Sequence, residues 1–370
     1  MTTSKQIKSK ISKEGLLTIS IDEVSVPEPG DGEVLIKVLA TPINPSDLGL
    51  LVGPADVSSL KEVEKGSVIE MKVPDGLIRS VAARFDQNLP VGNEGAGIVE
   101  SAGKGAEHLI GKTVGLAGGA MYSEYRCVPA SSCLVMNDGT TAEQAASCFV
   151  NPLTALGMVE TMRMENHTGL VHTAAASNLG QMLVKICLSE GIPLVNVVRK
   201  EEHIDMLKSL GATYVCNSSS DSFMEDLVKA LVQSGSTLGF DATGGGKLSS
   251  QILTAMEVAA NKTATEYSRY GSDKFKQVYI YGGLDRNPTT LTRSFGFSWG
   301  LGGWLLTPFI GRIGPEKFGE LRKKVADEIS TTFESKYSNL ISLEETLYLE
   351  NIHSYTKQAT GKKYLIKPNS

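Results

Sequence analysis

Cysteine is scarce in this chain, and its arrangement argues against two kinds of site. The 370 residues contain five cysteines and no Cys-x-x-Cys pair. They are Cys127, Cys133, Cys148, Cys187 and Cys216. An odd, irregularly spaced set favours neither a disulfide framework nor a thiolate zinc cluster. The polar, lysine-bearing residues 1–17 also lack the apolar core of a signal peptide, so we expect a reducing, cytoplasmic location.

An excess of basic residues and a long membrane-type apolar run are also missing. The chain has 36 Lys and Arg against 41 Asp and Glu, a net charge of -5, so we expect no nucleic-acid partner. The segment 294–311 carries no charge and reaches the length of a short membrane span. It also contains five glycines and Pro308. We therefore expect it to be a buried or interface segment, and we expect no membrane partner.

Glycine is plentiful, with 38 of 370 residues, against a usual share of about 7%. The length predicts two domains. Short alternating runs separated by Gly and Pro extend over residues 16–135, where 33–40, 97–100 and 112–115 are predicted strands. This third of the chain is predicted to be a mostly β domain. Residues 56–89 have mixed charge and little periodicity, and are expected to form an inserted surface excursion.

Strands and helices alternate after residue 141, where Thr141 to Gln144 forms a possible capping box. The predicted strands are 170–173, 194–198, 214–216, 238–241 and 277–281, and the predicted helices are 155–164, 179–189, 202–210, 223–233 and 249–259. This alternation predicts a parallel, doubly wound sheet and an α/β fold class. A helix over 317–331, a second capping box at Ser342 and a strand over 363–366 follow.

A turn of small residues joins the first of these strands to its helix. Residues 169–173 run into Ala174-Ala175-Ala176-Ser177-Asn178-Leu179-Gly180. A strand, a tight turn and a helix N-terminus together are typical of a pyrophosphate site. Of the glycines in G-x-G-x-x-G, only Gly180 is present. Ser177, Asn178, Leu179 and Gly180 are therefore candidate cofactor contacts, and an ordinary βα turn is equally compatible with the sequence.

Two cations follow the next strand and indicate which nucleotide would bind. Arg199 and Lys200 stand about 20 residues beyond Gly180, where an NAD-binding site would carry a carboxylate for the ribose hydroxyls. A carboxylate would repel a 2′-phosphate, whereas a guanidinium can hold one bidentately. The sequence thus favours NADPH over NADH. The alternative is a solvated pair of loop residues.

At this point several segments resemble one family. They are 42–47 (Pro-Ile-Asn-Pro-Ser-Asp), 90–97 (Pro-Val-Gly-Asn-Glu-Gly-Ala-Gly), 122–125, 151–155, the turn at 174–180, 210–212, 241–245 and 361–364. Their order and spacing resemble the medium-chain dehydrogenase/reductase superfamily. More narrowly, they are similar to its zinc-free branch of NADPH:quinone oxidoreductases and trans-2-enoyl thioester reductases.

The resemblance implies a fold, a division into domains and an oligomer. It implies a GroES-like, mostly β catalytic domain formed by both chain ends, residues 1–140 and 312–370. A Rossmann domain over 141–311 would be inserted between them, and the protein would be a homodimer. The further cofactor-binding residues that it implies are Asn151, Thr154, Thr243, Gly244, Tyr281, Gly282, Gly283 and Lys363.

The zinc ligands of the zinc-dependent relatives are absent from the matching positions. Those relatives carry Cys where Ser46 and Asp47 lie, His at Asn93 and a further Cys near Asn151. Because zinc needs three or four N, S or O ligands, we expect no metal. Without a Lewis acid, the natural acceptors are quinones and α,β-unsaturated carbonyls, which spread the developing charge so that a few hydrogen-bond donors suffice.

The sequence offers few candidates for catalytic residues. Asn44 is the first candidate for a hydrogen-bond donor near the nicotinamide, although it could instead cap the following turn. Many relatives have a tyrosine soon after the position of Asp47, but residues 51–55 here contain none. Tyr122 is a possible substitute or a core residue. The segment 295–304, rich in Phe, Trp and Gly, would cover a flat ligand or form a dimer contact.

Two other functions therefore stay open beside the quinone or enone reductase. One is an enoyl-thioester reductase, which would need a long apolar tunnel and a basic rim. The other is an NADPH-binding sensor or structural protein that has lost turnover, for which the missing tyrosine is the only support.

Overall fold

The computed structural model describes residues 3–370, which divide into two compact units. The first consists of residues 3–150 together with 322–370, and the second of residues 151–321. Two chain segments that are far apart in sequence therefore fold together in the first unit. The second unit is continuous in sequence.

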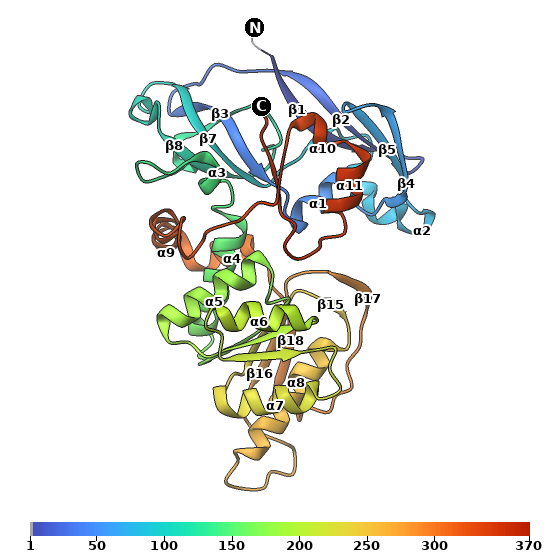
Figure 1. Ribbon diagram of the computed structural model, residues 1–370, viewed down its shortest axis with the longest axis vertical. Coiled ribbons are helices and arrows are strands. Elements are labelled where there is room, and N and C mark those ends of the chain that lie inside the picture. The colour runs from blue at the N-terminus through green and yellow to red at the C-terminus, as the bar shows by residue number, and fades with distance from the viewer. Residues whose placement is uncertain (1–2) are drawn as a thin grey trace. The chain divides into compact units, whose positions relative to one another are not determined.

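The first unit contains two mostly antiparallel sheets (Figure 1). One has the order β4-β5-β2-β1-β6, and the other β10-β8-β7-β3-β20-β19, with β9 also paired to β3. The strands are β1 (Thr3–Ile11), β2 (Leu16–Ser25), β3 (Glu33–Pro42), β4 (Asp56–Glu64), β5 (Val68–Lys72), β6 (Leu89–Pro90), β7 (Glu94–Ala102), β8 (Thr113–Ala117), β9 (Tyr125–Pro129), β10 (Leu134–Val135), β19 (Asn339–Ile341) and β20 (Tyr364–Ile366). The short helices are α1 (Pro45–Leu51), α2 (Asp75–Ile78), α3 (Ala142–Ala145), α10 (Leu343–Thr346) and α11 (Leu349–Tyr355), with 3-10 turns at 79–84, 107–109 and 130–132.

The alternation of buried and solvent-facing side chains explains why even the polar first strand belongs to a sheet. In β1, Ile7 and Ile11 are fully buried while the lysines between them are not. A period of two places such side chains on one face, where they join the core of the unit.

Residues 56–72 form two strands of the first sheet, which corrects the expectation of a surface excursion for this half of the segment 56–89, while residues 74–88 are mostly exposed. β4 pairs with β5, and β5 pairs with β2 over Leu16 to Ser20. Ile69 and Met71 of β5 are buried on the sheet's inner face. The weak periodicity has a physical cause, because β4 is an edge strand with most of its side chains exposed.

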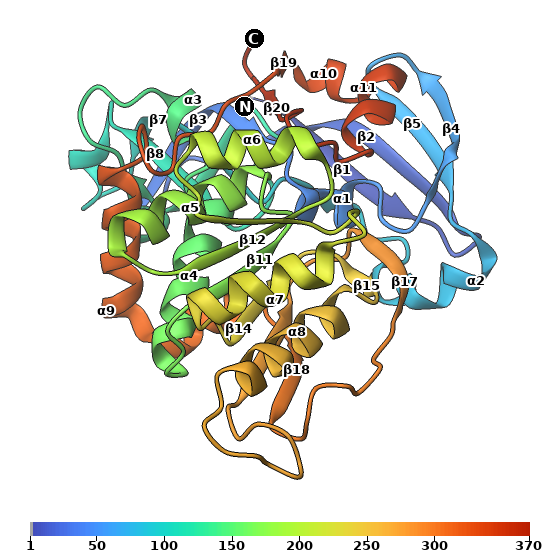
Figure 2. The same ribbon diagram turned by 60° about the horizontal axis from the view of Figure 1, so that its bottom comes forward.

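The second unit is built on a six-stranded parallel sheet, as the alternation predicted. Its order is β13-β12-β11-β14-β16-β18, with every neighbouring pair parallel. The strands are β11 (Leu170–Thr173), β12 (Leu194–Val198), β13 (Tyr214–Asn217), β14 (Leu238–Asp241), β16 (Lys276–Ile280) and β18 (Trp299–Gly303). Figures 1 and 2 show α5 and α6 on one face of this sheet and α7 and α8 on the other, so the doubly wound α/β fold is confirmed.

Four helices of this region match the predicted ones to within three residues, whereas the helix predicted over 155–164 begins at Val150 and the one predicted over 317–331 ends at Asp327. The observed helices are α4 (Val150–Met164), α5 (Asn178–Glu190), α6 (Glu201–Ser209), α7 (Phe223–Ser234), α8 (Leu248–Lys262) and α9 (Leu306–Asp327). α9 is two helices that meet at Gly314, whose φ of 76° is not helical, so Pro315 opens the second one, two residues before the predicted start at 317. The capping boxes at Thr141 and Ser342 are both present, each with its side chain accepting a bond from the third helical residue.

A short parallel ribbon extends beyond the sheet, formed by β15 (Gly244–Gly246) and β17 (Asp285–Thr289). The uncharged segment 294–311 forms strand β18 and the first turns of α9. Within residues 3–370, no helix has both the length and the apolarity to cross a membrane.

Candidate functional site

The turn Asn44-Pro45-Ser46-Asp47 lies where β3 ends and α1 begins, and a buried carboxylate holds it in place. Asp47 Oδ2 accepts a hydrogen bond from the Asn44 backbone N–H at 2.8 Å. Its other oxygen, Oδ1, accepts from the Asn93 backbone N–H at 2.7 Å. Asp47 is only 1% exposed. The carboxylate therefore joins two segments that are 46 residues apart in the sequence.

A second buried carboxylate orients the side chain of Asn44. Glu94 Oε1 accepts from Asn44 Nδ2 at 2.7 Å, and Glu94 Oε2 accepts from the backbone N–H groups of Phe149 and Val150 at 2.8 and 2.9 Å. Because a carboxylate accepts, the nitrogen of the Asn44 amide must face Glu94. The opposite atom, Oδ1, is buried and has no hydrogen-bond partner among residues 3–370.

Burial shifts the pKa values of this group. It raises the pKa of Asp47 to about 7, against the lowering effect of the two backbone N–H donors. Burial likewise raises the pKa of Glu94, with nearby Lys363 acting in the opposite direction. The same burial lowers the pKa of Lys363 to about 8. Shifted carboxylates and amines of this kind concentrate at functional sites, and also occur in structural ion networks.

Tyr122 lies in the interior of this unit, and Lys363 is partly buried. The Tyr122 side chain is fully buried, and its hydroxyl donates to the Pro42 carbonyl at 3.2 Å. Lys363 Nζ donates to Ser147 Oγ at 2.8 Å and lies over the ring of Tyr337 at 5.5 Å. Of the predicted site residues, Asn44, Tyr122 and Lys363 are in the first unit.

The turn from Ala174 to Gly180 combines a left-handed residue, a capped helix and a tightly packed glycine. Ala174 adopts a φ of 51°, a left-handed conformation that is uncommon for residues other than glycine. Ser177 is the N-cap of α5, and its Oγ accepts from the Gly180 N–H at 3.1 Å. A Cβ at Gly180 would lie 2.1 Å from the Ala175 carbonyl oxygen, so the helix packs on the turn only because this residue is glycine. Asn178 and Leu179 lie in the first turn of α5.

The two predicted phosphate-binding cations lie together at the end of β12, and both are exposed. Lys200 Nζ contacts Glu202 Oε1 at 3.1 Å. Both partners of this pair are more than 60% exposed, and such a pair contributes little to stability. Arg199 is therefore the cation with fewer competing interactions.

The ends of β14 and β16 bring the remaining predicted residues together. Asp241, which is fully buried, accepts from Thr173 Oγ1 at 2.9 Å and from the Thr243 backbone N–H at 2.8 Å. It thereby ties the end of β11 to the start of the glycine segment. A Cβ at Gly244 would meet the Gly282 carbonyl oxygen at 2.7 Å, so these two loops are in close contact.

Tyr281 makes its hydrogen bond inside the unit. Its hydroxyl lies 2.7 Å from His172 Nε2, and burial lowers the pKa of His172 to about 4. Gly282 and Gly283 follow directly. Asn151 and Thr154 lie on α4, with Thr154 only 7% exposed.

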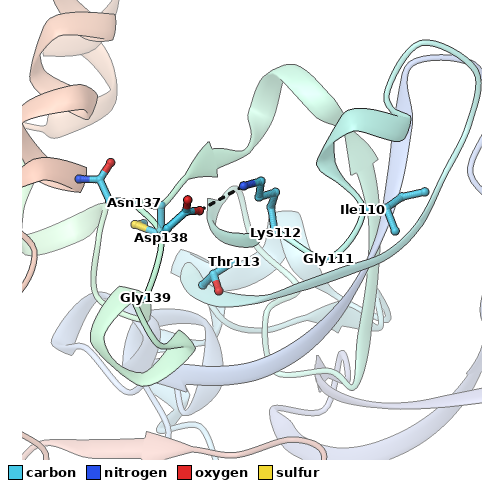
Figure 3. A pocket seen from close by; sticks show the side chains of 8 residues that line it. Ile110, Gly111, Lys112, Thr113, Asn137, Asp138 and Gly139 are labelled. Atoms are coloured by element: carbon cyan, nitrogen blue, oxygen red, sulfur yellow. Dashed lines mark hydrogen bonds and ion pairs between the residues drawn. The ribbon is translucent and has the colours of Figure 1, made fainter.

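Metal ligands are not grouped in the described part of the chain. No cluster of three His, Cys, Asp or Glu side chains within residues 3–370 could hold a metal ion. A polar hollow at the edge of β8 is lined by residues that include Lys112, Thr113 and Asp138, and the ion pair between Lys112 and Asp138 spans it at 3.1 Å (Figure 3). It contains none of the predicted site residues.

Asp47, Glu94 and Asp241 lie within segments that resemble the family, but no role was predicted for them from the sequence. All three are carboxylates within runs of small or apolar residues, and all three are buried. A charge that interrupts an otherwise buried pattern is the signal that could have identified them, since acidic residues are almost never fully buried unless paired.

Comparison with known proteins gives three findings. Residues 30–138 match the family described as the alcohol dehydrogenase GroES-like domain. The chain is 26% identical over 208 residues to the mitochondrial enoyl-[acyl-carrier-protein] reductase of Caenorhabditis elegans, covering 54% of this chain and 53% of that protein. It is 27% identical over 276 residues to an NADPH quinone oxidoreductase of Kluyveromyces marxianus, covering 70% and 64% respectively. The matches thus span between half and two thirds of these relatives.

The fold has a close counterpart among solved structures. A mutant form of enoyl thioester reductase from Candida tropicalis superimposes with a TM-score of 0.67 at 20% identity, covering 99% of this chain and all of the other. This likeness shows the fold. Together with the relatives above, it confirms the resemblance to the medium-chain dehydrogenase/reductase superfamily.

Proposed function

We propose that this chain, a relative of the medium-chain dehydrogenases and reductases, is an oxidoreductase that uses NADPH to reduce a conjugated acceptor, a quinone or an α,β-unsaturated carbonyl. The second unit would bind the nucleotide. The observation that carries this proposal is the turn at Ala174 to Gly180, which joins a strained backbone, a capped helix and a glycine with no room for a side chain.

NADPH fits the residues at this turn. A pyrophosphate at the N-terminus of α5 would meet backbone N–H groups and the positive end of a helix of 13 residues. Arg199 would take the 2′-phosphate, with Lys200 as a weaker partner. Thr243, Gly244, Gly282 and Gly283 line the neighbouring strand ends and are proposed to border the nicotinamide half. When bound, NADPH supplies the hydride.

The acceptor is proposed from the polar groups of the first unit. Where zinc-dependent relatives carry ligands, this chain has Ser46 and Asn93, which form a hydrogen bond instead. A few hydrogen-bond donors can suffice for an acceptor that delocalises its charge, whereas a simple ketone gathers the charge on one oxygen, which a Lewis acid would stabilise. An enoyl-thioester reductase is the second candidate, favoured by the enoyl reductase among the relatives. A nucleotide-binding sensor without turnover is the third.

Two further expectations stay proposals. A homodimer is favoured by β18, an edge strand whose surroundings expose Phe297 (85%) and Leu305 (64%), because a second copy could cover this apolar edge. A cytoplasmic location is favoured by five free cysteines, four of them buried.

The test is a panel of acceptors with purified protein. NADPH oxidation is followed with benzoquinones, 2-cyclohexen-1-one and a trans-2-enoyl-CoA, and NADPH affinity is measured separately by fluorescence. Turnover with quinones or enones supports the proposal, and faster turnover with the enoyl-CoA supports the second candidate. Tight NADPH binding without turnover of any acceptor would favour the sensor. A nucleotide complex in which Arg199 and Lys200 make no contact would overturn the preference for NADPH.

A further inference from the structure

The parallel sheet of the second unit reverses its strand order between β11 and β14. In the order β13-β12-β11-β14-β16-β18, the strands that follow β11 in the sequence lie first on one side of it and then on the other. In open α/β sheets, ligands bind outside the carboxyl ends of the strands at such a switch point. The turn at 174–180 follows β11 and the glycine segment 243–246 follows β14, so these two segments flank the switch point.

A side chain takes over from backbone pairing at this point. The ladder between β11 and β14 ends at His172 and Phe240. One residue further on, Thr173 Oγ1 donates to Asp241 Oδ1 at 2.9 Å and accepts from the Ala242 backbone N–H at 2.8 Å. Thr173 is only 1% exposed and Asp241 is fully buried, so water does not compete for these bonds. The Thr173 hydroxyl therefore joins the two strand ends.

We propose that Thr173 is a positioning residue, whose hydroxyl holds the turn at 174–180 and the glycine segment 243–246 in a fixed relation, so that both halves of the dinucleotide bind together. This inference rests on the proposed function. It concerns a buried residue that lies before the turn and outside the predicted cofactor contacts.

The hydroxyl acts on the start of both segments. Ala174, the residue after Thr173, has the left-handed φ of 51° with which the turn begins. On the other side, Asp241 Oδ1 also accepts from the Thr243 backbone N–H at 2.8 Å, one residue before Gly244, whose φ is 78°. A strained residue such as Ala174 persists only where its surroundings fix it. Loss of the hydroxyl should therefore let the turn and the glycine segment move relative to each other.

The sheet should keep its fold without this hydroxyl. His172, the preceding residue, points to the opposite face of the sheet, where its Nε2 lies 2.7 Å from the Tyr281 hydroxyl. That contact joins the end of β11 to the end of β16 and does not involve Thr173. Valine has nearly the shape of threonine, so Thr173→Val removes two hydrogen bonds and little packing.

The Thr173 hydroxyl needs an acceptor at position 241, and a neutral one should serve. Asp241 Oδ1 accepts from Thr173 and from the Thr243 N–H, while its other oxygen accepts from Ser249 Oγ at 2.6 Å. An amide oxygen can also accept two hydrogen bonds. Asp241→Asn should therefore lower stability through the lost Ser249 bond but retain most of the NADPH affinity.

Thr173→Val tests the inference with two ligands, NADPH and adenosine 2′,5′-bisphosphate, which contains only the adenine half of the dinucleotide. The variant should weaken NADPH binding by roughly 10-fold, the effect of losing one hydrogen bond to a charged group. Affinity for the bisphosphate should stay nearly unchanged, because one half of the site suffices for it. Thr173→Ser, which keeps the hydroxyl, should recover most of the NADPH affinity. Fluorescence titration measures NADPH binding, and calorimetry measures the bisphosphate.

Thr161→Val is the matched control. Thr161 is fully buried in the same unit, and its hydroxyl also makes two hydrogen bonds, donating to the Gly157 carbonyl at 2.7 Å and accepting from Trp304 Nε1 at 3.0 Å. Both valine variants should be less stable in urea than the unaltered protein. Only Thr173→Val should lose affinity for NADPH while keeping it for the bisphosphate.

The outcomes separate the inference from the proposed function. If the unaltered protein binds NADPH and Thr173→Val binds it equally well, the positioning role is wrong while the proposed function stands. The same holds if Thr173→Val weakens both ligands alike, if Thr161→Val shows the same selective loss, or if Thr173→Ser does not recover NADPH binding. If the unaltered protein binds neither ligand, the proposed function is wrong and the inference fails with it.

Discussion

The two units hold their candidate sites in different ways. In the first unit, the buried carboxylates of Asp47 and Glu94 accept hydrogen bonds that fix Asn44 and Asn93. In the second, the turn at 174–180 is made of Ala, Ser, Asn, Leu and Gly, and its shape comes from backbone angles and a missing side chain. The candidate site of the first unit therefore depends on buried ionisable groups, and that of the second unit on the absence of a side chain at Gly180. The first should respond to pH and to neutral substitutions, and the second to added volume.

The most severe test of this contrast is added volume at Gly180. A Cβ there would lie 2.1 Å from a backbone oxygen that cannot move aside without changing the turn. Gly180→Val should weaken NADPH binding by roughly 100-fold, or about 2.8 kcal/mol. Fluorescence titration with NADPH measures the change. Gly319→Ala on α9 is the control, because a Cβ there meets nothing within 4 Å. Equal affinity in both variants would show that space at the turn does not limit binding.

A buried ion pair in the second unit tests whether charge matters there too. Lys276 Nζ contacts Glu257 Oε2 at 2.6 Å, with the two side chains only 0% and 6% exposed. Burial acts to raise the pKa of Glu257, but donation from Lys276 and Ser272 outweighs it, and the pKa is lowered overall. Lys276→Met leaves that carboxylate without its cation, so the free energy of unfolding should fall by about 3–5 kcal/mol.

Urea denaturation measures this loss, and NADPH affinity is measured beside it. Lys274→Met, at an exposed lysine two residues earlier, should change stability by less than about 0.5 kcal/mol. We expect Lys276→Met to leave NADPH affinity nearly unchanged where the protein is folded. A large loss of affinity would show that charge supports the nucleotide site as well, and the contrast between the units would fail.

Titration of Asp47 is the third test. Its pKa of about 7 in the folded chain lies above the value of about 3.9 in an unfolded one. The folded state therefore holds the proton more tightly, and this residue's contribution to stability is full below pH 4 and is lost as pH rises towards 7. Lys363, with a pKa of about 8, stays charged across most of that range.

The variant Asp47→Asn removes this titration while keeping the size of the side chain. Its amide can accept one of the two backbone hydrogen bonds, so the variant should be less stable than the unaltered chain at pH 5. The difference in free energy of unfolding should narrow between pH 5 and pH 7. Asp75→Asn, at an exposed residue of the same unit, is the control. A difference that widens with pH would show that Asp47 is ionised throughout and stabilises the fold through its charge.

The contrast between the units also explains what the sequence could predict. The strands 170–173, 194–198 and 238–241 were placed with their observed bounds, because each is a short, mostly apolar segment between helices and is buried along its whole length. The turn at 174–180 was also found, since its signal is local. The ribbon β15 could not be predicted, because Gly244-Gly245-Gly246 has no intrinsic strand preference and becomes a strand only through its pairing with β17.

The polar group of the first unit has no local signal of comparable strength. Glu94 reaches Asn44 across 50 residues and Val150 across 56, and neither contact leaves a periodic pattern. The sequence predicted Asn44 as a donor, but it could not show that Glu94 takes the Asn44 amide nitrogen. Residues 56–72 were misplaced for a related reason, because an exposed edge strand does not alternate clearly between apolar and polar side chains.

The smallest expected effect separates the two cations at the end of β12, and it tests whether any charge contributes to the nucleotide site. Arg199→Ala should weaken NADPH binding by about 10-fold, a value in keeping with one lost charge-assisted hydrogen bond of about 1.5 kcal/mol. NADH binding should not change, because NADH lacks the 2′-phosphate.

Lys200→Ala should have a smaller effect on NADPH binding, since Lys200 is already paired with Glu202. Glu202→Gln releases that lysine and should strengthen NADPH binding slightly. Dissociation constants for both nucleotides, measured at two salt concentrations, check the order. If Lys200→Ala weakens NADPH binding more than Arg199→Ala does, Lys200 contacts the 2′-phosphate in place of Glu202. The ion pair with Glu202 would then not keep Lys200 from the nucleotide.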